Sequence, residues 1–125
     1  PSFKSIQVRL EVADLKRSID FYRNQLGFML TLTWPSESPE LAFLNRDGLR
    51  LQLAAAEQPA ERPTCSLWID VEGVEDFHSA VKNEVAIDWG PEVFFHGRRE
   101  FAFKDPDGYS ITLSEVTDDP PTTDS

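Results

Sequence analysis

Few side chains in this chain are suited to metal or nucleophilic chemistry, and they do not form a familiar motif. The sequence holds two His and one Cys. His78 falls on an expected helix and is interpreted as a surface residue, whereas His96 precedes the last expected hairpin and could line the mouth of a cleft. Cys65 is expected to be a buried structural thiol. A lone Cys also excludes an intramolecular disulfide, so we predict a reducing, cytoplasmic location.

A second set of polar side chains alternates with aliphatic residues along the expected strands, which places the set on one sheet face. Its members are Gln7, Arg9, Glu11, Arg50, Gln52, Ser66, Trp68, Asp70, Ser110, Thr112 and Ser114. This face is too polar for a core, and Trp68 favours a wet pocket over a plain solvated surface. Glu11 or Asp70 could serve there as a base. The alternative is that they pair with Arg9 or Arg50 across the sheet.

The elements that must position these residues are read from periodicity and turn residues. Asp14 stands where a helix cap belongs, helical spacing follows from Leu15, and Gly27 supplies the stop. A second helix carries Val74, Phe77 and Val81 on one face. Strands are expected at 6–12, 28–34, 40–44, 49–54, 66–71, 91–95, 99–103 and 109–115. Turns are expected at Arg46-Asp47-Gly48 and Asp105-Pro106-Asp107-Gly108.

The chain repeats itself at a spacing of about 60 residues. The segment 41–48 (LAFLNRDG) resembles 101–108 (FAFKDPDG), and the apolar alternation at 49–53 recurs at 109–113. Each half reads strand–helix–strand–strand–strand, so we expect two similar packed modules, and paired modules tend to enclose a binding cleft. The predicted boundaries are 4–56 for the first module, 57–63 for a linker, 64–116 for the second module and 117–125 for a flexible tail.

Composition narrows the classes of partner. The net charge is −10, and nucleic acid is an unsuitable partner because phosphate binding needs clustered Lys and Arg. An acidic chain attracts cations instead. No apolar run approaches the length of a membrane span and no signal peptide is visible, so we expect no membrane association.

Two segments resemble the vicinal oxygen chelate superfamily, which includes glyoxalase I, extradiol dioxygenases and the fosfomycin and bleomycin resistance proteins. They are 12–28, which runs VADLKRSIDFYRNQLGF, and 99–108, which runs REFAFKDPDG. The similarity covers residues 5–116. It implies an α+β fold of two βαβββ modules whose curled mixed sheets form a cup.

Enzymes of this superfamily hold a divalent metal with His, Glu or Gln from the first and last strands of each module. The resemblance puts those positions at Gln7, Gln52, Ser66 and Thr112. Two amides and two hydroxyls supply neither negative charge nor imidazole. Glu115 lies near Thr112, but strand alternation directs it to the other face. We therefore expect no metal, no cofactor and no catalytic residue.

What remains resembles the bleomycin resistance proteins, acidic cytoplasmic dimers that sequester a cationic antibiotic. The sequence thus predicts a homodimer that binds an aromatic, cationic small molecule through stacking and negative charge. The predicted ligand-binding residues are Trp34, Arg50, Gln52, Trp68, Phe95, His96 and Thr112. Arg98 and Arg99 oppose a purely cation-seeking site. The alternatives are a metal-dependent glyoxalase-like lyase or dioxygenase with an atypical ligand set, and a structural or regulatory dimer whose binding role is vestigial.

Overall fold

The computed structural model describes residues 1–58 and 64–123. Contacts divide the chain into two compact units, Pro1–Glu61 and Arg62–Ser125, which we call the first and second modules. The first contains β1 (Val8–Val12), α1 (Leu15–Asn24), β2 (Met29–Trp34), β3 (Leu41–Arg46) and β4 (Leu49–Ala55). The second contains β5 (Ser66–Asp70), α2 (Val74–Val81), β6 (Ile87–Phe94), β7 (Arg98–Lys104) and β8 (Ser110–Val116).

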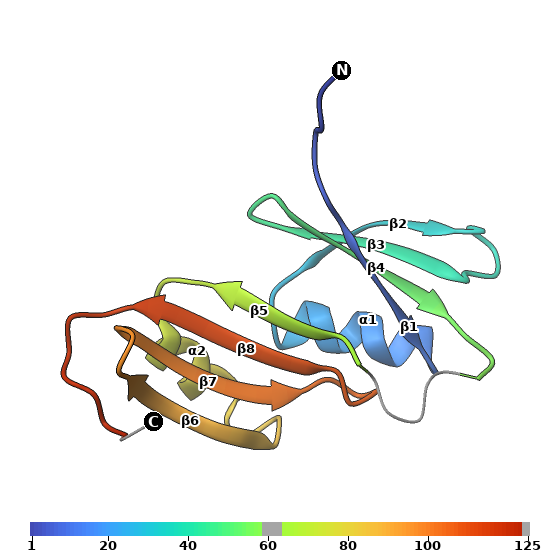
Figure 1. Ribbon diagram of the computed structural model, residues 1–125. Coiled ribbons are helices and arrows are strands. Elements are labelled where there is room, and N and C mark those ends of the chain that lie inside the picture. The colour runs from blue at the N-terminus through green and yellow to red at the C-terminus, as the bar shows by residue number, and fades with distance from the viewer. Residues whose placement is uncertain (59–63, 124–125) are drawn as a thin grey trace. The chain divides into compact units, whose positions relative to one another are not determined.

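Each module is a four-stranded mixed sheet with one helix packed on it, and the two sheets have the same topology (Figure 1). The strand orders are β1-β4-β3-β2 and β5-β8-β7-β6. In each, the first and last strands of the module pair in parallel and the other pairs are antiparallel. The predicted α+β fold of two βαβββ modules is confirmed.

The first helix begins and ends where the sequence signals predict. The Asp14 carboxylate accepts a hydrogen bond from the Arg17 backbone N–H at 3.1 Å, which satisfies one of the donors left free at a helix start. At the other end Gly27 adopts φ 67°, and its backbone N–H bonds to the carbonyl of Arg23 at 3.1 Å. This is an αL termination, which needs the left-handed conformation that glycine adopts readily.

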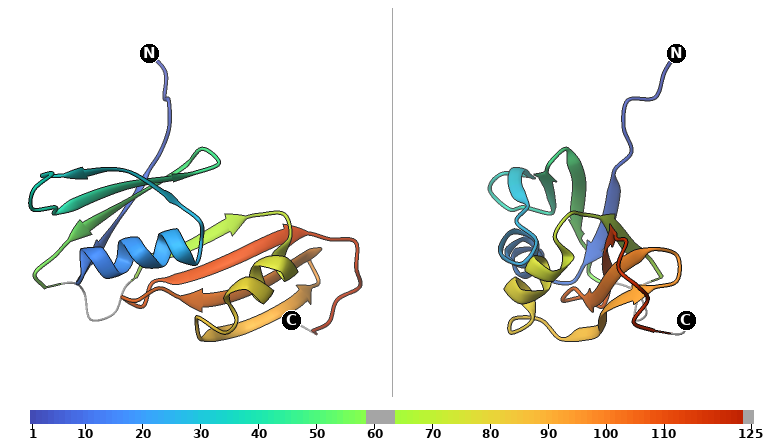
Figure 2. Two further views of the ribbon diagram at one scale, coloured as in Figure 1. Left: turned by 180° about the vertical axis from the view of Figure 1, so that it is seen from behind. Right: turned by 90° about the vertical axis from the view of Figure 1, so that its left-hand side faces the viewer.

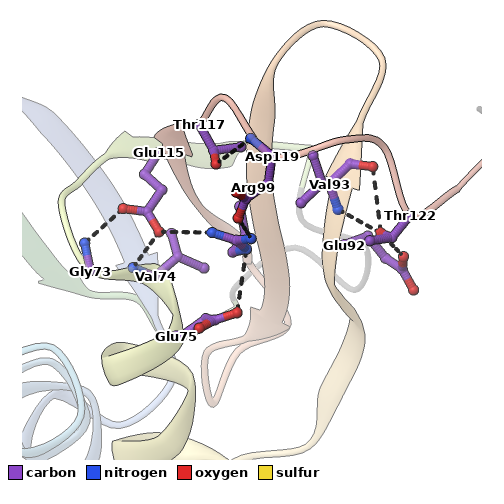
Figure 3. A network of polar contacts seen from close by, with 10 residues as sticks. All are labelled: Gly73, Val74, Glu75, Glu92, Val93, Arg99, Glu115, Thr117, Asp119 and Thr122. Atoms are coloured by element: carbon purple, nitrogen blue, oxygen red, sulfur yellow. Dashed lines mark hydrogen bonds and ion pairs between the residues drawn. The ribbon is translucent and has the colours of Figure 1, made fainter.

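The second helix is capped from a distance. Its N-cap residue is Gly73, which has no side chain to offer. The Glu115 carboxylate of β8 takes over, accepting hydrogen bonds from the backbone N–H groups of Gly73 at 2.9 Å and Val74 at 3.2 Å (Figure 3). Glu115 therefore faces the helix, as alternation predicted, and an anion there also complements the helix dipole.

Strand β6 is longer than the predicted 91–95 and is irregular. Its pairing with β7 shifts register between Ile87 and Trp89 and again between Trp89 and Glu92. Gly90-Pro91 lies at the second shift, and proline cannot donate a ladder hydrogen bond. Strand β1 is shorter than predicted, since its pairing begins at Val8 and Ile6 is exposed.

The two hairpins differ by one residue, which corrects the alignment of the repeat. Phe43 pairs with Gln52 in the first module, whereas Ala102 pairs with Thr112 in the second. Ala42 therefore lies on the helix side beside Leu53, but Ala102 lies on the opposite side beside Thr112. The physical reason is turn length, because Arg46 pairs directly with Leu49 around Asp47-Gly48, while a longer turn separates Lys104 from Ser110.

Residues 117–123, predicted as part of a flexible tail, lie against the second module, and Figure 2 shows this segment running back toward β6. The backbone N–H of Thr117 bonds to the carbonyl of Gly97, and both backbone groups of Val93 bond to Thr122. The tail thus satisfies the outer edge of β6 at Val93. The flexibility of this segment stays a prediction. Residues 124–125 and most of the predicted linker lie outside the described residues.

Within the described ranges, no helix is both long enough and apolar enough to cross a membrane.

Candidate functional site

The first module has a pocket on the sheet face away from its helix, which we call its polar face. The pocket has a volume of about 450 Å³ and is lined by Gln7, Thr31, Phe43, Leu44, Asn45, Arg50 and Gln52. Its amides are tied together. The Gln52 side-chain N–H donates to the Gln7 oxygen at 3.0 Å, and the Arg9 Nε–H donates to the Gln52 oxygen at 2.8 Å. Parallel pairing of β1 with β4 brings Arg9 and Gln52 side by side.

The residues at the superfamily's metal positions do not suit a divalent ion, as these contacts show. A metal would need the oxygens of Gln7 and Gln52, but one accepts the neighbouring amide and the other accepts a guanidinium. A fixed positive charge beside a neutral donor opposes cation binding. The remaining positions, Ser66 and Thr112, are neutral hydroxyls on β5 and β8. Nowhere in residues 1–58 or 64–123 do three His, Cys, Asp or Glu group closely enough to hold a metal.

On the polar face of the second module, Trp68 is held in place by its neighbours. Its indole N–H donates to Glu100 Oε2 at 3.2 Å, and the Arg98 guanidinium lies 4.8 Å from the ring centroid. Arg98 is in turn fixed by Asp70 at 2.9 Å and by the Ser114 hydroxyl at 3.3 Å. Trp68 as a whole residue is nonetheless 53% exposed. An exposed aromatic ring with a fixed orientation is a platform on which a flat ligand can stack.

Glu100 joins this platform to a second pocket of the same module. That pocket has a volume of about 550 Å³ and is lined by Trp89, Glu92, Phe94, His96, Glu100 and Thr123. The Glu100 side chain is only 10% exposed, and His96 Nε2 lies 3.9 Å from its Oε2. The rings are in mutual contact, with His96 stacked on Phe94 at 5.8 Å and Trp89 edge-on to Phe94 at 5.7 Å. The pocket thus combines carboxylates with aromatic surface.

The two arginines that seemed to oppose a cation site are both neutralised. Arg98 pairs with Asp70 on the polar face. Arg99 points to the helix side, where it contacts Glu75 at 3.4 Å, Glu115 at 4.0 Å and Asp119 (Figure 3). The hydrogen bond to Asp119 raises the pKa of Arg99 above its ordinary value, against the lowering effect of burial. Asp70 therefore has Arg98 of its own module as a partner, which the sequence analysis did not anticipate.

The predicted ligand-binding residues fall into two groups on separate modules. Arg50 and Gln52 line the first pocket, and Trp34, at the end of β2, lines neither pocket. In the second module Trp68 and His96 converge on Glu100. Thr112 lies beside Trp68 in the β5–β8 register. Phe95 sits in the turn after β6, 77% exposed, with its ring edge-on to His96.

Sequence reasoning missed Glu100 and Glu92 and misjudged two smaller points. Alternation along β7 could have placed Glu100 on the same face as Arg98 and Ala102, but its burial and its bond to Trp68 depend on strand order. Cys65 is exposed, which overturns the expected buried thiol, because it precedes β5 instead of entering the core. His78 is half-buried and edge-on to Phe101, so it supports packing.

Comparison with known sequences identifies a family whose model matches most of this chain. The family model described as the Glyoxalase/Bleomycin resistance protein/Dioxygenase superfamily matches residues 4–113. An uncharacterized protein, YraH of Bacillus subtilis (strain 168), is 34% identical over 58 residues, which is 46% of this chain and 44% of that protein. This match therefore spans less than half of the curated relative.

Solved structures share the fold at low identity. TioX from Micromonospora sp. ML1 superposes with a TM-score of 0.79 at 20% identity, covering 91% of this chain and 99% of that one. A glyoxalase/bleomycin resistance protein/dioxygenase from Nocardioides gives 0.74 at 17% identity, covering 100% and 91%. A lactoylglutathione lyase from Agrobacterium tumefaciens gives 0.73 at 18% identity, covering 92% and 95%. Identities this low show a common fold and leave the chemistry to the residues.

Proposed function

The chain belongs to the Glyoxalase/Bleomycin resistance protein/Dioxygenase superfamily, and from that premise we propose that it binds and sequesters an aromatic, cationic small molecule without catalysing a reaction on it. The ligand class is that of the bleomycin-type antibiotics. Within this superfamily fold alone does not separate enzymes from binding proteins. The proposal therefore depends on the side chains of the two polar faces.

The observation that carries the proposal is the second module's polar face, where Trp68 and the carboxylate of Glu100 are fixed together. Stacking on the indole suits a flat heteroaromatic ring, and the buried carboxylate suits a positive charge. The pocket of the first module, taken by itself, carries amide and guanidinium donors at Gln7, Gln52 and Arg50, which can hydrogen-bond to a polar ligand.

The direct test is titration of the purified chain with metal-free bleomycin, followed by calorimetry and Trp fluorescence. We expect saturable heat and quenching. Trp68→Ala should raise Kd by about tenfold, since it removes both stacking and buried aromatic area. Trp34→Ala, made in parallel, tests the predicted contribution of Trp34 independently. Absence of both heat and quenching at high micromolar ligand would remove this ligand class.

The enzymatic alternative, a metal-dependent lyase or dioxygenase, is not favoured by the donors present, because Arg9 occupies the Gln52 oxygen. Elemental analysis of protein purified without chelators tests it separately. We expect substoichiometric Ni, Zn, Fe and Mn. A stoichiometric metal whose retention is lost in Gln7→Ala and Gln52→Ala would reverse the assignment.

The homodimer implied by the superfamily also stays a proposal. It is supported by exposed apolar side chains of the first module, since Met29 is 69% and Leu32 58% exposed. Such residues favour burial against a partner. Light scattering of the full chain should give twice the chain mass. A clean monomer that still binds ligand would remove the dimer and keep the binding function, whereas a dimer indifferent to Trp68→Ala in every binding assay would favour a purely structural role.

A further inference from the structure

The second module's pocket differs from a general acidic surface because a nearly buried carboxylate lines it and one oxygen of that carboxylate has no partner among the described residues. Both contacts of the Glu100 side chain, to the Trp68 indole and to His96, involve Oε2. No contact within the described residues is made by Oε1. No side-chain oxygen that is fully buried there lacks a hydrogen bond, so Oε1 keeps access to solvent, and Glu100 is one of the residues that line the pocket. A carboxylate so enclosed favours a positive partner.

The walls of the pocket suit an organic cation better than a hydrated metal ion. Three ring systems, those of Trp89, Phe94 and His96, line it together with a second carboxylate, Glu92. Aromatic faces attract alkylammonium and guanidinium groups, whereas a hard metal ion would need several more oxygen ligands. The volume of about 550 Å³ exceeds the needs of a bare ion and accommodates a substituted ammonium group.

Nearby positive charge does not fill the pocket. The Arg98 guanidinium, on the strand beside Phe94, points to Asp70 and Ser114. Arg99 lies on the helix side with Glu75 and Asp119, and Lys104 is bonded to Asp88 at 2.6 Å. Each basic side chain of β7 thus pairs with an acidic residue that does not line the pocket. The two glutamates of the pocket therefore keep their net negative potential.

We propose that this pocket is a subsite for the cationic group of the ligand, with Glu100 Oε1 and Glu92 as its anionic contacts and the Trp89, Phe94 and His96 rings as its walls. The inference rests on the proposed function, because it assigns a place to the ligand's positive charge. The C-terminal segment completes the subsite. The Thr122 hydroxyl donates to Glu92 Oε2 at 2.5 Å (Figure 3). Thr123 is one of the residues that line the pocket. Thr122 is therefore a positioning residue for Glu92.

Choline tests the subsite without the rest of the ligand. The indole N–H resonances of the full chain are assigned by Trp→Phe variants and followed during titration. We expect saturable shifts at Trp68 and Trp89, and none at Trp34 in the first module. The neutral isostere 3,3-dimethylbutan-1-ol should bind about tenfold more weakly, because it keeps the shape and loses the charge. Equal affinity for the two probes would overturn the proposal.

Matched carboxylate variants separate the pocket from overall charge. Glu100→Gln keeps an acceptor for the Trp68 indole and removes the negative charge, so choline affinity should fall about tenfold. Glu84→Gln removes the same charge from an exposed site after α2 and should leave affinity unchanged. Equal losses in both would show a nonspecific charge effect and overturn the subsite. If Glu100→Gln lowers the unfolding midpoint, Glu92→Gln at the rim replaces it, with a smaller expected loss.

The subsite and the proposed function can fail separately. Choline binding with no response to bleomycin would support the subsite and remove the antibiotic class. Bleomycin binding that is unaffected by Glu100→Gln and Glu92→Gln, together with no choline binding, would overturn the subsite and keep the function.

Discussion

The two modules share one topology but present opposite chemistry on their polar faces. Parallel pairing sets Arg9 beside Gln52 in the first module and Trp68 beside Thr112 in the second. The first face is a chain of amides ending in a guanidinium. The second is an aromatic platform tied to a buried carboxylate. Backbone topology thus decides where side chains point, and residue identity decides what they bind.

The modules also differ in how they hold their helices. The first helix is capped by a residue adjacent to it in sequence, Asp14, whereas the second depends on Glu115 of the last strand. Glu115 further contacts Arg99, which holds Asp119 of the tail. The second module therefore caps its helix through a polar contact between residues far apart in sequence, whereas the first module caps its helix with a neighbouring residue. Substitutions at equivalent features should separate these two modes.

The largest difference in the free energy of unfolding is expected between alanine variants of two glycines, one in each module. Gly90 has φ 84°, and a Cβ there would meet Phe101 Cα at 2.8 Å and the backbone carbonyl of Glu100. Gly48 has φ 82° with nothing within 4 Å. Gly90→Ala should lower the free energy of unfolding by about 3 kcal/mol and Gly48→Ala by about 1 kcal/mol, because only the first adds a backbone clash to left-handed strain. Urea unfolding measures both. Equal losses would show that strain alone matters and that β6 can move away from β7.

Removing the two helix caps should give the next largest difference in the free energy of unfolding. Asp14→Ala removes one capping bond and should cost about 1 kcal/mol, in line with other N-caps. Glu115→Ala removes two capping bonds and the contact with Arg99, and should cost about 2 kcal/mol. Thermal and urea unfolding check the order. A Glu115→Ala variant no less stable than Asp14→Ala would mean that water replaces the long-range cap at little cost.

The smallest effect is expected from the tail. Thr122→Val keeps the shape of the residue and removes the hydroxyl that bonds to Glu92 and to the Val93 backbone N–H. We expect a loss of about 1 kcal/mol in unfolding free energy, typical of one or two partly exposed hydrogen bonds. Thr33→Val on β2, the corresponding edge strand of the first module, serves as the matched control and should change little. Equal effects would indicate that the tail contributes nothing specific at the β6 edge.

Much of the fold could be predicted from the chain because its signals are local. Asp14 and Gly27 mark the ends of a helix, Asp47-Gly48 forms a turn with φ of 51° and 82°, and alternation assigns the faces of most strands. The repeat led to the right topology, but it aligned Ala42 with Ala102, and these two residues lie on opposite sides of their sheets because one extra turn residue reverses the facing of a strand. The tail's contacts with β6 carried no local signal.

The candidate site was predicted only in part. Alternation placed Trp68, Gln52 and Arg50 on polar faces, since side-chain direction in a strand follows sequence parity. Sequence parity did not predict the hydrogen-bond partners of those side chains. That Glu100 would be enclosed beneath the Trp68 indole depends on β5, β8 and β7 lying in that order.

The sequence by itself determined the modules, their element order, the lack of anionic donors at the superfamily's metal positions and the acidity of the chain, because these depend on composition, periodicity and neighbours. Only the tertiary structure decided that Arg9 occupies the Gln52 oxygen, that Glu115 caps a helix across the sheet and that Glu100 lines an aromatic pocket. Hydrogen bonds between residues far apart in sequence form only once strand order and register bring the groups within about 3 Å of each other, and no local pattern encodes that distance.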